Sequence, residues 1–171
     1  CGLCRGLKRR GNKPKSFGLF SSKPNHYVSM DTFHIGYGGK AHAVLHMIDI
    51  FSRFEVSLLC EGLEATAYDT FNLLEKWRRQ SGCYPRVVLS DGGPEFNNQL
   101  ISEFTSRRNI RHINSPIHSP WANGLCEVPG KILKNMVYKI STVLSVEVGK
   151  ELPLRVVLKE AVFTKNCTPI K

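Results

Sequence analysis

The sequence lacks any uninterrupted run of about eighteen apolar residues, the length that a membrane-spanning helix requires. It also lacks a leader with a charged start and an apolar stretch, so we expect neither a membrane span nor secretion. An initiating Met is missing, because the chain starts at Cys1, and we therefore expect a piece of a longer protein. The 171 residues are 42% hydrophobic, which is enough for a single domain with its own core.

Acidic residues are scarce, because 14 Asp and Glu stand against 24 Lys and Arg, for a formal net charge of +10. This excess favours a polyanionic partner, with a basic protein that has no specific ligand as the alternative. The first two dozen residues contain no acid and hold a block of cations: Arg5, Lys8, Arg9, Arg10, Lys13, Lys15 and Lys23. Such a block does not fold by itself, so residues 1–24 are expected to form a nucleic-acid-binding arm in which Arg9 and Arg10 contact the nucleic acid.

The cysteines do not have the pattern of a disulfide framework. Four of the six stand in or beside apolar patterns: Cys60, Cys83, Cys126 and Cys167. We expect these four to be buried thiols in a reducing compartment. Cys1 and Cys4 differ, because a C-x-x-C pair is half of a tetrahedral zinc site. No His or Cys pair with suitable spacing follows, so Zn²⁺ could bind here only with two further ligands upstream.

Apolar patterns predict five strands and four helices. We expect the strands at 27–35, 41–50, 54–60, 86–90 and 109–114. The first helix should follow a capping box at Thr66 and Asp69, and the second should follow Asn97 or Asn98. The third is expected to carry an apolar stripe: Ile132, Met136, Val137, Ile140 and Leu144. The last is expected to have Pro153 at its first helical position.

The order of these elements predicts an α/β fold. The first three strands follow one another through short turns, so they should form an antiparallel meander. The fourth strand arrives by way of a helix and is therefore expected to run parallel to the first strand and beside it. The sequence thus predicts a mixed five-stranded sheet, half antiparallel and half parallel, flanked by helices.

Two carboxylates should meet in this sheet. Asp91 follows the strand 86–90 and precedes a Gly-Gly-Pro turn, and Asp31 lies in the strand 27–35. Neighbouring carboxylates raise each other's pKa and are costly unless a cation is present. Mg²⁺ prefers one or two carboxylates with water and phosphate oxygens. Two such ions about 4 Å apart can hold the attacking and leaving oxygens of a phosphoryl displacement. Strand-end acids that cap backbone amides are the alternative interpretation of both residues.

The three acids Asp31, Asp91 and Glu127, with 35 residues between the last two, resemble the D-D-35-E triad of retroviral and LTR-retrotransposon integrases. The flanks also resemble this family: Met30-Asp31-Thr32, Ser90-Asp91-Gly92-Gly93-Pro94-Glu95-Phe96 and His118-Ser119-Pro120-Trp121-Ala122-Asn123-Gly124. The C-x-x-C pair and the cations after it resemble the Cys-Cys end of the zinc module that precedes the core in such integrases. The resemblance implies a ribonuclease-H-like catalytic core over residues 25–171, cut short at its C-terminal end.

The resemblance also implies an activity. Asp31 would bridge two Mg²⁺ or Mn²⁺ ions, Asp91 would complete one metal site and Glu127 the other. The reaction would be trimming of the 3′ ends of element DNA and their transfer into double-stranded target DNA. Integrases act as multimers on host chromatin, so a homo-oligomer, made in the cytoplasm and acting in the nucleus, is expected. Two alternatives stay open: a DNA-binding module with impaired catalysis, and a nuclease of the same fold.

The residues around Glu127 carry further expectations. Lys131 and Lys134 lie one and two turns beyond it. We expect them to contact the phosphates of nucleic acid, and the alternative is that they only form a solvent-exposed face of the helix. Asn123 is expected to shape the preceding loop and to contact nucleic acid. Asp49 is expected to form a turn, and Glu95 to be a solvated turn acid.

The chain departs from the family pattern directly after Glu127, where Pro129 and Gly130 follow. Inside a helix, Pro129 would clash with the carbonyl of Leu125 and cost about 3 kcal/mol, and Gly130 would cost roughly 1 kcal/mol more. We therefore expect the helix to begin near Leu125 or Cys126, so that a frayed first turn holds Glu127.

Overall fold

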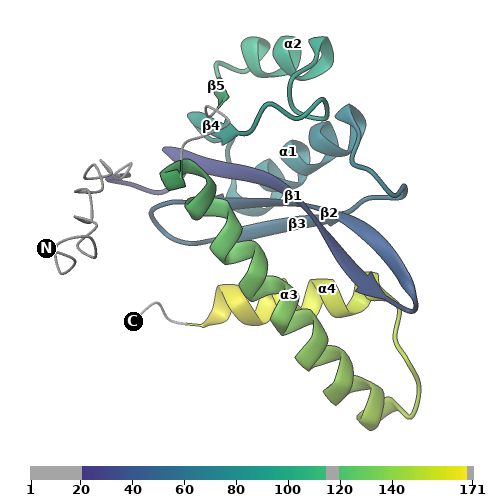
Figure 1. Cartoon of the computed structure of the whole chain (residues 1–171). Coiled ribbons are helices and arrows are strands. Elements are labelled where there is room, and N and C mark those ends of the chain that lie inside the picture. The colour runs from purple at the N-terminus through teal and green to yellow at the C-terminus, as the bar shows by residue number, and fades with distance from the viewer. Residues whose placement is uncertain (1–20, 115–119, 169–171) are drawn as a thin grey trace, which may run out of the picture.

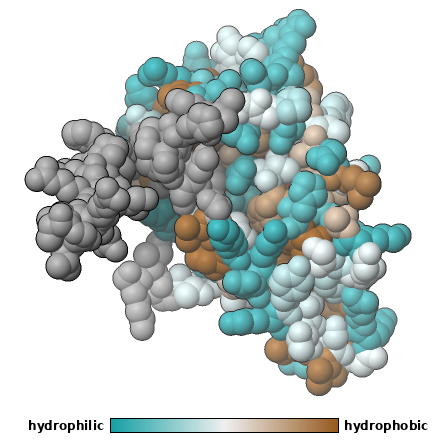
Figure 2. Space-filling model, in the orientation of Figure 1, coloured by the Kyte–Doolittle hydropathy of each residue, from teal (hydrophilic) through white to brown (hydrophobic). Residues whose placement is uncertain are grey.

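The computed structural model describes residues 21–114 and 120–168, and for residues 120–127 it describes the helical backbone alone. One sheet lies in the middle of the molecule, with two helices on each side of it (Figure 1). On the face that Figure 2 shows, hydrophobic residues form separate patches in a largely hydrophilic surface. Within the described ranges, no helix is both long and apolar enough to cross a membrane.

The sheet has five strands: β1 (Tyr27–Tyr37), β2 (Lys40–Asp49), β3 (Glu55–Leu59), β4 (Val87–Ser90) and β5 (Arg111–Asn114). Their order is β3-β2-β1-β4-β5. β1 pairs antiparallel with β2, and β2 with β3, while β4 runs parallel to both of its neighbours, β1 and β5. The predicted mixed sheet is therefore confirmed. β1 runs two residues further than expected, because Gly38 and Gly39, with φ of 56° and 73°, make a two-residue turn.

One face of the sheet packs on α1 (Ala67–Ser81) and α2 (Gln99–Arg107). Thr66 and Asp69 form the predicted capping box of α1, and Asn98 caps α2. The core on this side takes alternate residues of the strands together with buried helix residues, among them Met30, Leu45, Leu73, Trp77 and Phe104. The alternation along the strands and the caps of both helices match the sequence patterns, so this half of the molecule agrees closely with the prediction.

The other face packs on α3 (Pro120–Val148) and α4 (Leu154–Cys167), which cross each other in Figure 1. Its core contains Ile35, Val44, Leu133, Val137 and Val157. The expected stripe on α3 is wrong in one place, because Ile132 is 45% exposed and Leu133 points into the core instead. At the start of α4, Pro153 is the N-cap residue and not the first helical residue.

The expectation that α3 begins near Leu125 or Cys126 is wrong, because the helix begins at Pro120 and contains Pro129 in its interior. The physical reason is packing. Pro129 and Gly130 are both buried, and a Cβ placed on Gly130 would lie 3.4 Å from the ring of Phe33. The glycine thus lets α3 come close to β1, and contacts with the sheet offset the weak turn that Pro129 causes.

Two expectations about side chains also change. Cys60 is a buried thiol as expected, but Cys83 and Cys167 are exposed, because Cys83 follows the C-cap of α1 and Cys167 is the last residue of α4. Asp49 does form a turn, since one of its carboxylate oxygens accepts a hydrogen bond from the backbone N–H of Ser52 at 2.8 Å.

A buried group of charged residues ties α4 to the sheet. His46 Nε2 lies 2.8 Å from Glu55 Oε1, and both side chains are fully buried. Lys165 of α4 forms an ion pair with the second oxygen of Glu55. The Asn166 side chain accepts from the backbone N–H of Glu55 at 2.9 Å and donates to its carbonyl at 2.8 Å. The end of α4 is therefore fixed to the first residue of β3.

Burial is the largest influence on His46, and the positive charge of Lys165 acts in the same direction, so that the pKa of His46 falls from 6.5 to about 3. The charge of Asp31 opposes this shift. The unfolded chain takes up a proton at this position near pH 6.5, whereas the folded chain does so only near pH 3. The contribution of His46 to the free energy of unfolding is therefore fully present above pH 6.5. It is lost as the pH falls from 6.5 toward 3, by up to about 1.4 kcal/mol per pH unit.

We predict that His46→Gln flattens this dependence, because the substituted side chain has no proton to gain. The measurement is chemical denaturation of both proteins at several pH values between about 6.5 and 5, above the range in which most carboxyl groups titrate. The more exposed His34, replaced by Gln, serves as the control and should keep the slope of the parent protein. An unchanged slope in His46→Gln contradicts the assignment.

Candidate active site

Asp31 lies within β1, on the sheet face that packs against α3 and α4. Its cross-strand partner in β2 is His46. The backbone N–H of Thr32 donates to Asp31 Oδ1 at 2.9 Å. Burial raises the pKa of Asp31, and the nearby charges of Asp91 and Glu95 act in the same direction, while the Thr32 hydrogen bond and His46 oppose them. Asp31 is thus a half-buried acid with two other acids close enough to repel it.

Asp91 follows the last residue of β4 and is exposed. The parallel ladder between β1 and β4 ends with Ser29 opposite Leu89. Asp31 and Asp91 each stand two residues beyond these partners, Asp31 in the middle of β1 and Asp91 directly after β4. The backbone N–H of Gly93 donates to Asp91 Oδ1 at 3.0 Å, which orients the carboxylate in its turn.

Glu95 belongs to the same group, and the interpretation of this residue as a solvated turn acid is wrong. Its side chain is half-buried, and Thr32 Oγ1 donates to its Oε1 at 2.7 Å. Its charge acts on Asp31. The sequence held one signal for this placement: Phe96 directly follows Glu95 and is 1% exposed. A turn held by a buried aromatic residue keeps its neighbouring side chain against the protein.

The structure describes only part of the other predicted site residues. The backbone of Asn123 and Glu127 lies in α3, and Glu127 is roughly two turns from the helix start, so it is not in a first turn. Their side chains lie outside the described residues. Arg9 and Arg10, and the half zinc site of Cys1 and Cys4, lie outside them as well.

Lys134 stands on the Asp31 side of the sheet. Its Nζ lies 5.8 Å from the centre of the Phe33 ring. Phe33 is two residues beyond Asp31 and therefore on the same face of β1. Lys131 lies one turn earlier on α3 and is exposed. At least one cation of α3 is thus held over the strand that carries Asp31.

The family of the chain follows from its sequence match. A family model described as integrase core domain matches residues 21–120, which is more than half of the chain. The chain belongs to the integrase core domain family. The matched stretch contains Asp31 and Asp91 and ends before Glu127.

Two relatives show how small a part of longer proteins this integrase core is. The Gag-Pro-Pol polyprotein of Mason-Pfizer monkey virus is 30% identical over 128 residues, which are 72% of this chain and 7% of the polyprotein. An uncharacterized 39.2 kDa protein of insertion element IS476 from Xanthomonas euvesicatoria is 32% identical over 113 residues, 64% of this chain and 31% of that protein. The chain therefore spans less than two thirds of the length of these relatives.

Solved structures confirm the ribonuclease-H-like fold of an integrase core. The simian T-cell lymphotropic virus intasome, solved in complex with the PP2A regulatory subunit B56 gamma, matches with a TM-score of 0.82 and 23% identity, over 100% of this chain and 59% of that chain. The trimeric form of the HTLV-2 integrase catalytic core domain, solved in complex with magnesium, matches with a TM-score of 0.69 and 24% identity, over 86% of each chain.

The described part of this integrase core fits a divalent cation in part. Asp31 and Asp91 offer the oxygen ligands that Mg²⁺ and Mn²⁺ prefer, and a cation between them would relieve the repulsion that raises the pKa of Asp31. Among the side chains that the structure describes, no three His, Cys, Asp or Glu residues are arranged to hold a metal ion. The side chain of Glu127 lies outside the described residues.

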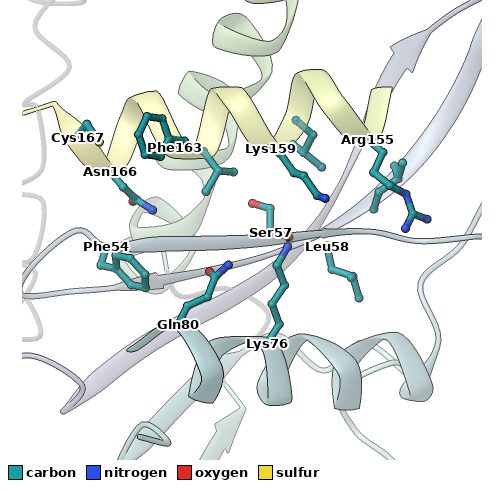
Figure 3. A pocket seen from close by; sticks show the side chains of 13 residues that line it. Phe54, Ser57, Leu58, Lys76, Gln80, Arg155, Lys159, Phe163, Asn166 and Cys167 are labelled. Carbon is teal, nitrogen blue, oxygen red and sulfur yellow. Dashed lines mark hydrogen bonds between the residues drawn. The ribbon is translucent and has the colours of Figure 1, made fainter. Parts of the chain in front are cut away.

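A groove lies elsewhere, between α4, β3 and α1 (Figure 3). Its volume is about 550 Å³, and none of the candidate carboxylates lines it. Leu58, Val162 and Phe163 contribute apolar surface, and Lys76, Arg155 and Lys159 contribute positive charge. Lys76 Nζ donates to the carbonyl of Ser57 in β3 at 2.6 Å. Burial lowers the pKa of Lys76, and the charges of Lys159 and Arg155 lower it further.

The two glycines after Asp91 give a matched pair of variants. A Cβ on Gly93 would collide with the Glu95 carboxylate and lie 3.1 Å from Asp91 Oδ1, whereas a Cβ on Gly92 meets nothing within 4 Å. We predict that Gly93→Ala displaces Glu95 from Thr32 but lowers the free energy of unfolding by less than about 1 kcal/mol, because the displaced atoms end a flexible side chain. Crystal structures and denaturant unfolding test this. Gly92→Ala should leave both unchanged, and an intact Thr32–Glu95 contact in Gly93→Ala contradicts the prediction.

Proposed function

We propose that this integrase core carries out DNA integration by metal-dependent polynucleotidyl transfer, with 3′-end processing followed by strand transfer. One observation carries the proposal: Asp31 and Asp91 each lie two residues beyond the last pair that joins the adjacent parallel strands β1 and β4, in a chain of the integrase core domain family. Relatives in a retroviral polyprotein and in an insertion element support the same class of reaction.

Three acids have distinct roles in this proposal. Asp31, Asp91 and Glu127 are the residues that would hold the two ions, with Asp31 shared between them. When bound, Mg²⁺ or Mn²⁺ supplies charge that activates the attacking water or 3′-hydroxyl and stabilises the leaving oxygen. The core structure of HTLV-2 integrase with magnesium supports this choice of ion. The protein needs no nucleophilic side chain of its own.

Basic residues bind the double-stranded DNA in this proposal. Lys131 and Lys134 hold phosphates beside the acids, and Lys134 already lies above β1. Asn123, Arg9 and Arg10 add contacts from the start of α3 and from the arm. Zn²⁺ would bind Cys1 and Cys4 only together with two ligands upstream. In this proposal the protein acts on host chromatin and therefore works in the nucleus.

A second candidate function is a DNA-binding module with impaired catalysis. The observation that favours it is Pro129 inside α3, because proline has no N–H to donate and weakens the turn that presents Glu127. A nuclease of the same fold, which cuts DNA without joining it, is the third candidate.

We predict that the purified chain joins the 3′ end of a labelled DNA duplex to a target duplex in the presence of Mn²⁺. Asp31→Asn and Asp91→Asn should each lower joining by at least about 100-fold, because each removes charge at the reacting phosphate. Glu147→Gln, an exposed change on α3, is the control. Cut but unjoined product supports the nuclease, and binding alone supports the non-catalytic module. Full activity of Asp31→Asn refutes the assignment of the acids.

Self-association is part of the proposal, since neighbours include an intasome and dimeric and trimeric forms of HTLV-2 integrase. We place the contact at the groove beside β3, because Phe163 is 63% exposed there.

We predict that Phe163→Lys shifts the chain toward monomer, since it removes apolar surface and adds a cation to a groove that is already lined by three cations. Analytical ultracentrifugation measures this. Val146→Lys, at a position 79% exposed on α3, should have no effect. Equal masses for both variants contradict the placement.

A further inference from the structure

The two candidate metal ligands stand where the sheet no longer holds their strands together. The parallel ladder between β1 and β4 ends at Ser29 and Leu89, two residues before Asp31 and Asp91. The pairing of β1 with β4 therefore aligns the two acids but stops short of their carboxylates. An error of about 1 Å in the position of a ligand is enough to impair a metal site. Another contact has to fix Asp31 relative to the Asp91 turn.

The Glu95 carboxylate lies in that gap and touches both sides. On the β1 side, Thr32 Oγ1 donates to Glu95 Oε1 at 2.7 Å. The same Thr32 donates its backbone N–H to Asp31 Oδ1 at 2.9 Å. On the β4 side, the second oxygen of Glu95 lies over Gly93, whose N–H donates to Asp91 Oδ1 at 3.0 Å. One carboxylate thus contacts the residues that orient both acids.

Glu95 is itself held by a firm turn. Phe96 is 1% exposed, and its N–H donates to the carbonyl of Gly93 at 3.0 Å. The Asn98 side chain donates to the carbonyls of Pro94 and Glu95 at 2.9 and 3.0 Å. The same Asn98 side chain caps α2, so the turn is continuous with the helix behind it. The position of Glu95 is therefore set by the core and not by solvent.

We propose that Glu95 is a positioning residue of the metal site: through Thr32 it fixes Asp31 at the separation from Asp91 that a divalent cation requires. We assign Glu95 a positioning role and not that of a ligand, because its Oε1 accepts from Thr32 and its Oε2 lies over Gly93. In agreement, Asp31, Asp91 and Glu95 are not arranged as a three-residue metal group among the described side chains. The inference rests on the proposed function, because it presupposes that Asp31 and Asp91 bind the ion.

The experiment measures Mn²⁺ affinity by calorimetric titration of the whole chain, without DNA and without turnover. Glu95→Gln keeps an oxygen acceptor for the Thr32 hydroxyl, and Glu95→Ala removes it. Thr32→Ser keeps the hydroxyl donor, and Thr32→Val replaces it with a methyl group. Glu147→Ala, an exposed acid far along α3, is the control for general loss of negative charge. Thermal unfolding of each variant is recorded alongside.

We expect Glu95→Ala and Thr32→Val to weaken Mn²⁺ binding by about tenfold, as loss of an outer contact does in other metal sites. Glu95→Gln and Thr32→Ser should stay within about threefold of the parent protein. The titrations are run at a temperature where every variant is folded. The matched pairs thus separate the hydrogen bond from charge and from side-chain volume.

Three results overturn the positioning role. If Glu95→Gln is as weak as Glu95→Ala while Thr32→Val binds like the parent protein, Glu95 acts as a ligand or through its charge. If only the unfolding temperatures fall while the affinities stay equal, its contribution is structural. If Asp31→Asn binds Mn²⁺ as tightly as the parent protein, the proposed metal site fails and the positioning role fails with it. The last result tests the function itself and is independent of all changes at Glu95.

Discussion

The parallel pairing of β1 with β4 is the constraint on which the candidate site depends. Only three residue pairs join the two strands, from Tyr27–Val87 to Ser29–Leu89. This short ladder sets the register, and the register places Asp31 and Asp91 at equivalent positions just beyond the last pair. The core on both faces serves this alignment: α1 and α2 cover one side, and α3 and α4 cover the other. The loop after β4 then completes the arrangement, because its turn carries Glu95 back to Thr32.

A second set of polar contacts runs in the opposite direction from Asp31, across the sheet. Its cross-strand neighbour His46 lies 2.8 Å from Glu55, and Glu55 is paired with Lys165 of α4. Burying two charges is costly, and removing one partner of such a pair destabilises a protein by about 3–5 kcal/mol. Polar contacts thus connect the strand beside Asp31 to α4. The last helix contributes to the site without reaching it, because it fixes the residue beside Asp31.

Local patterns predicted the strands, α1 and the parallel pairing of β1 with β4, because strand periodicity and the crossover rule need no knowledge of packing. The start of α3 was not predictable in this way. The cost of Pro129 is local, but the gain from Gly130 against Phe33 comes from a strand about a hundred residues earlier in the chain. Glu95 shows the same limit, since its partner Thr32 is 63 positions away. Ile132 and Leu133 are equally apolar, and only the final direction of α3 decides which of them is buried.

The hydrogen bond from Lys76 to Ser57 has a consequence for how this sheet meets other chains. β3 is an edge strand, and the free carbonyls of an edge strand are a template for adding a further strand and for aggregation. Here one of these carbonyls already accepts from a partly buried cation at 2.6 Å. An incoming strand would have to strip that cation from its acceptor and leave it near Arg155 and Lys159, which repel it. The lysine thus occupies an acceptor on the open edge of the sheet and disfavours the addition of a further strand at Ser57.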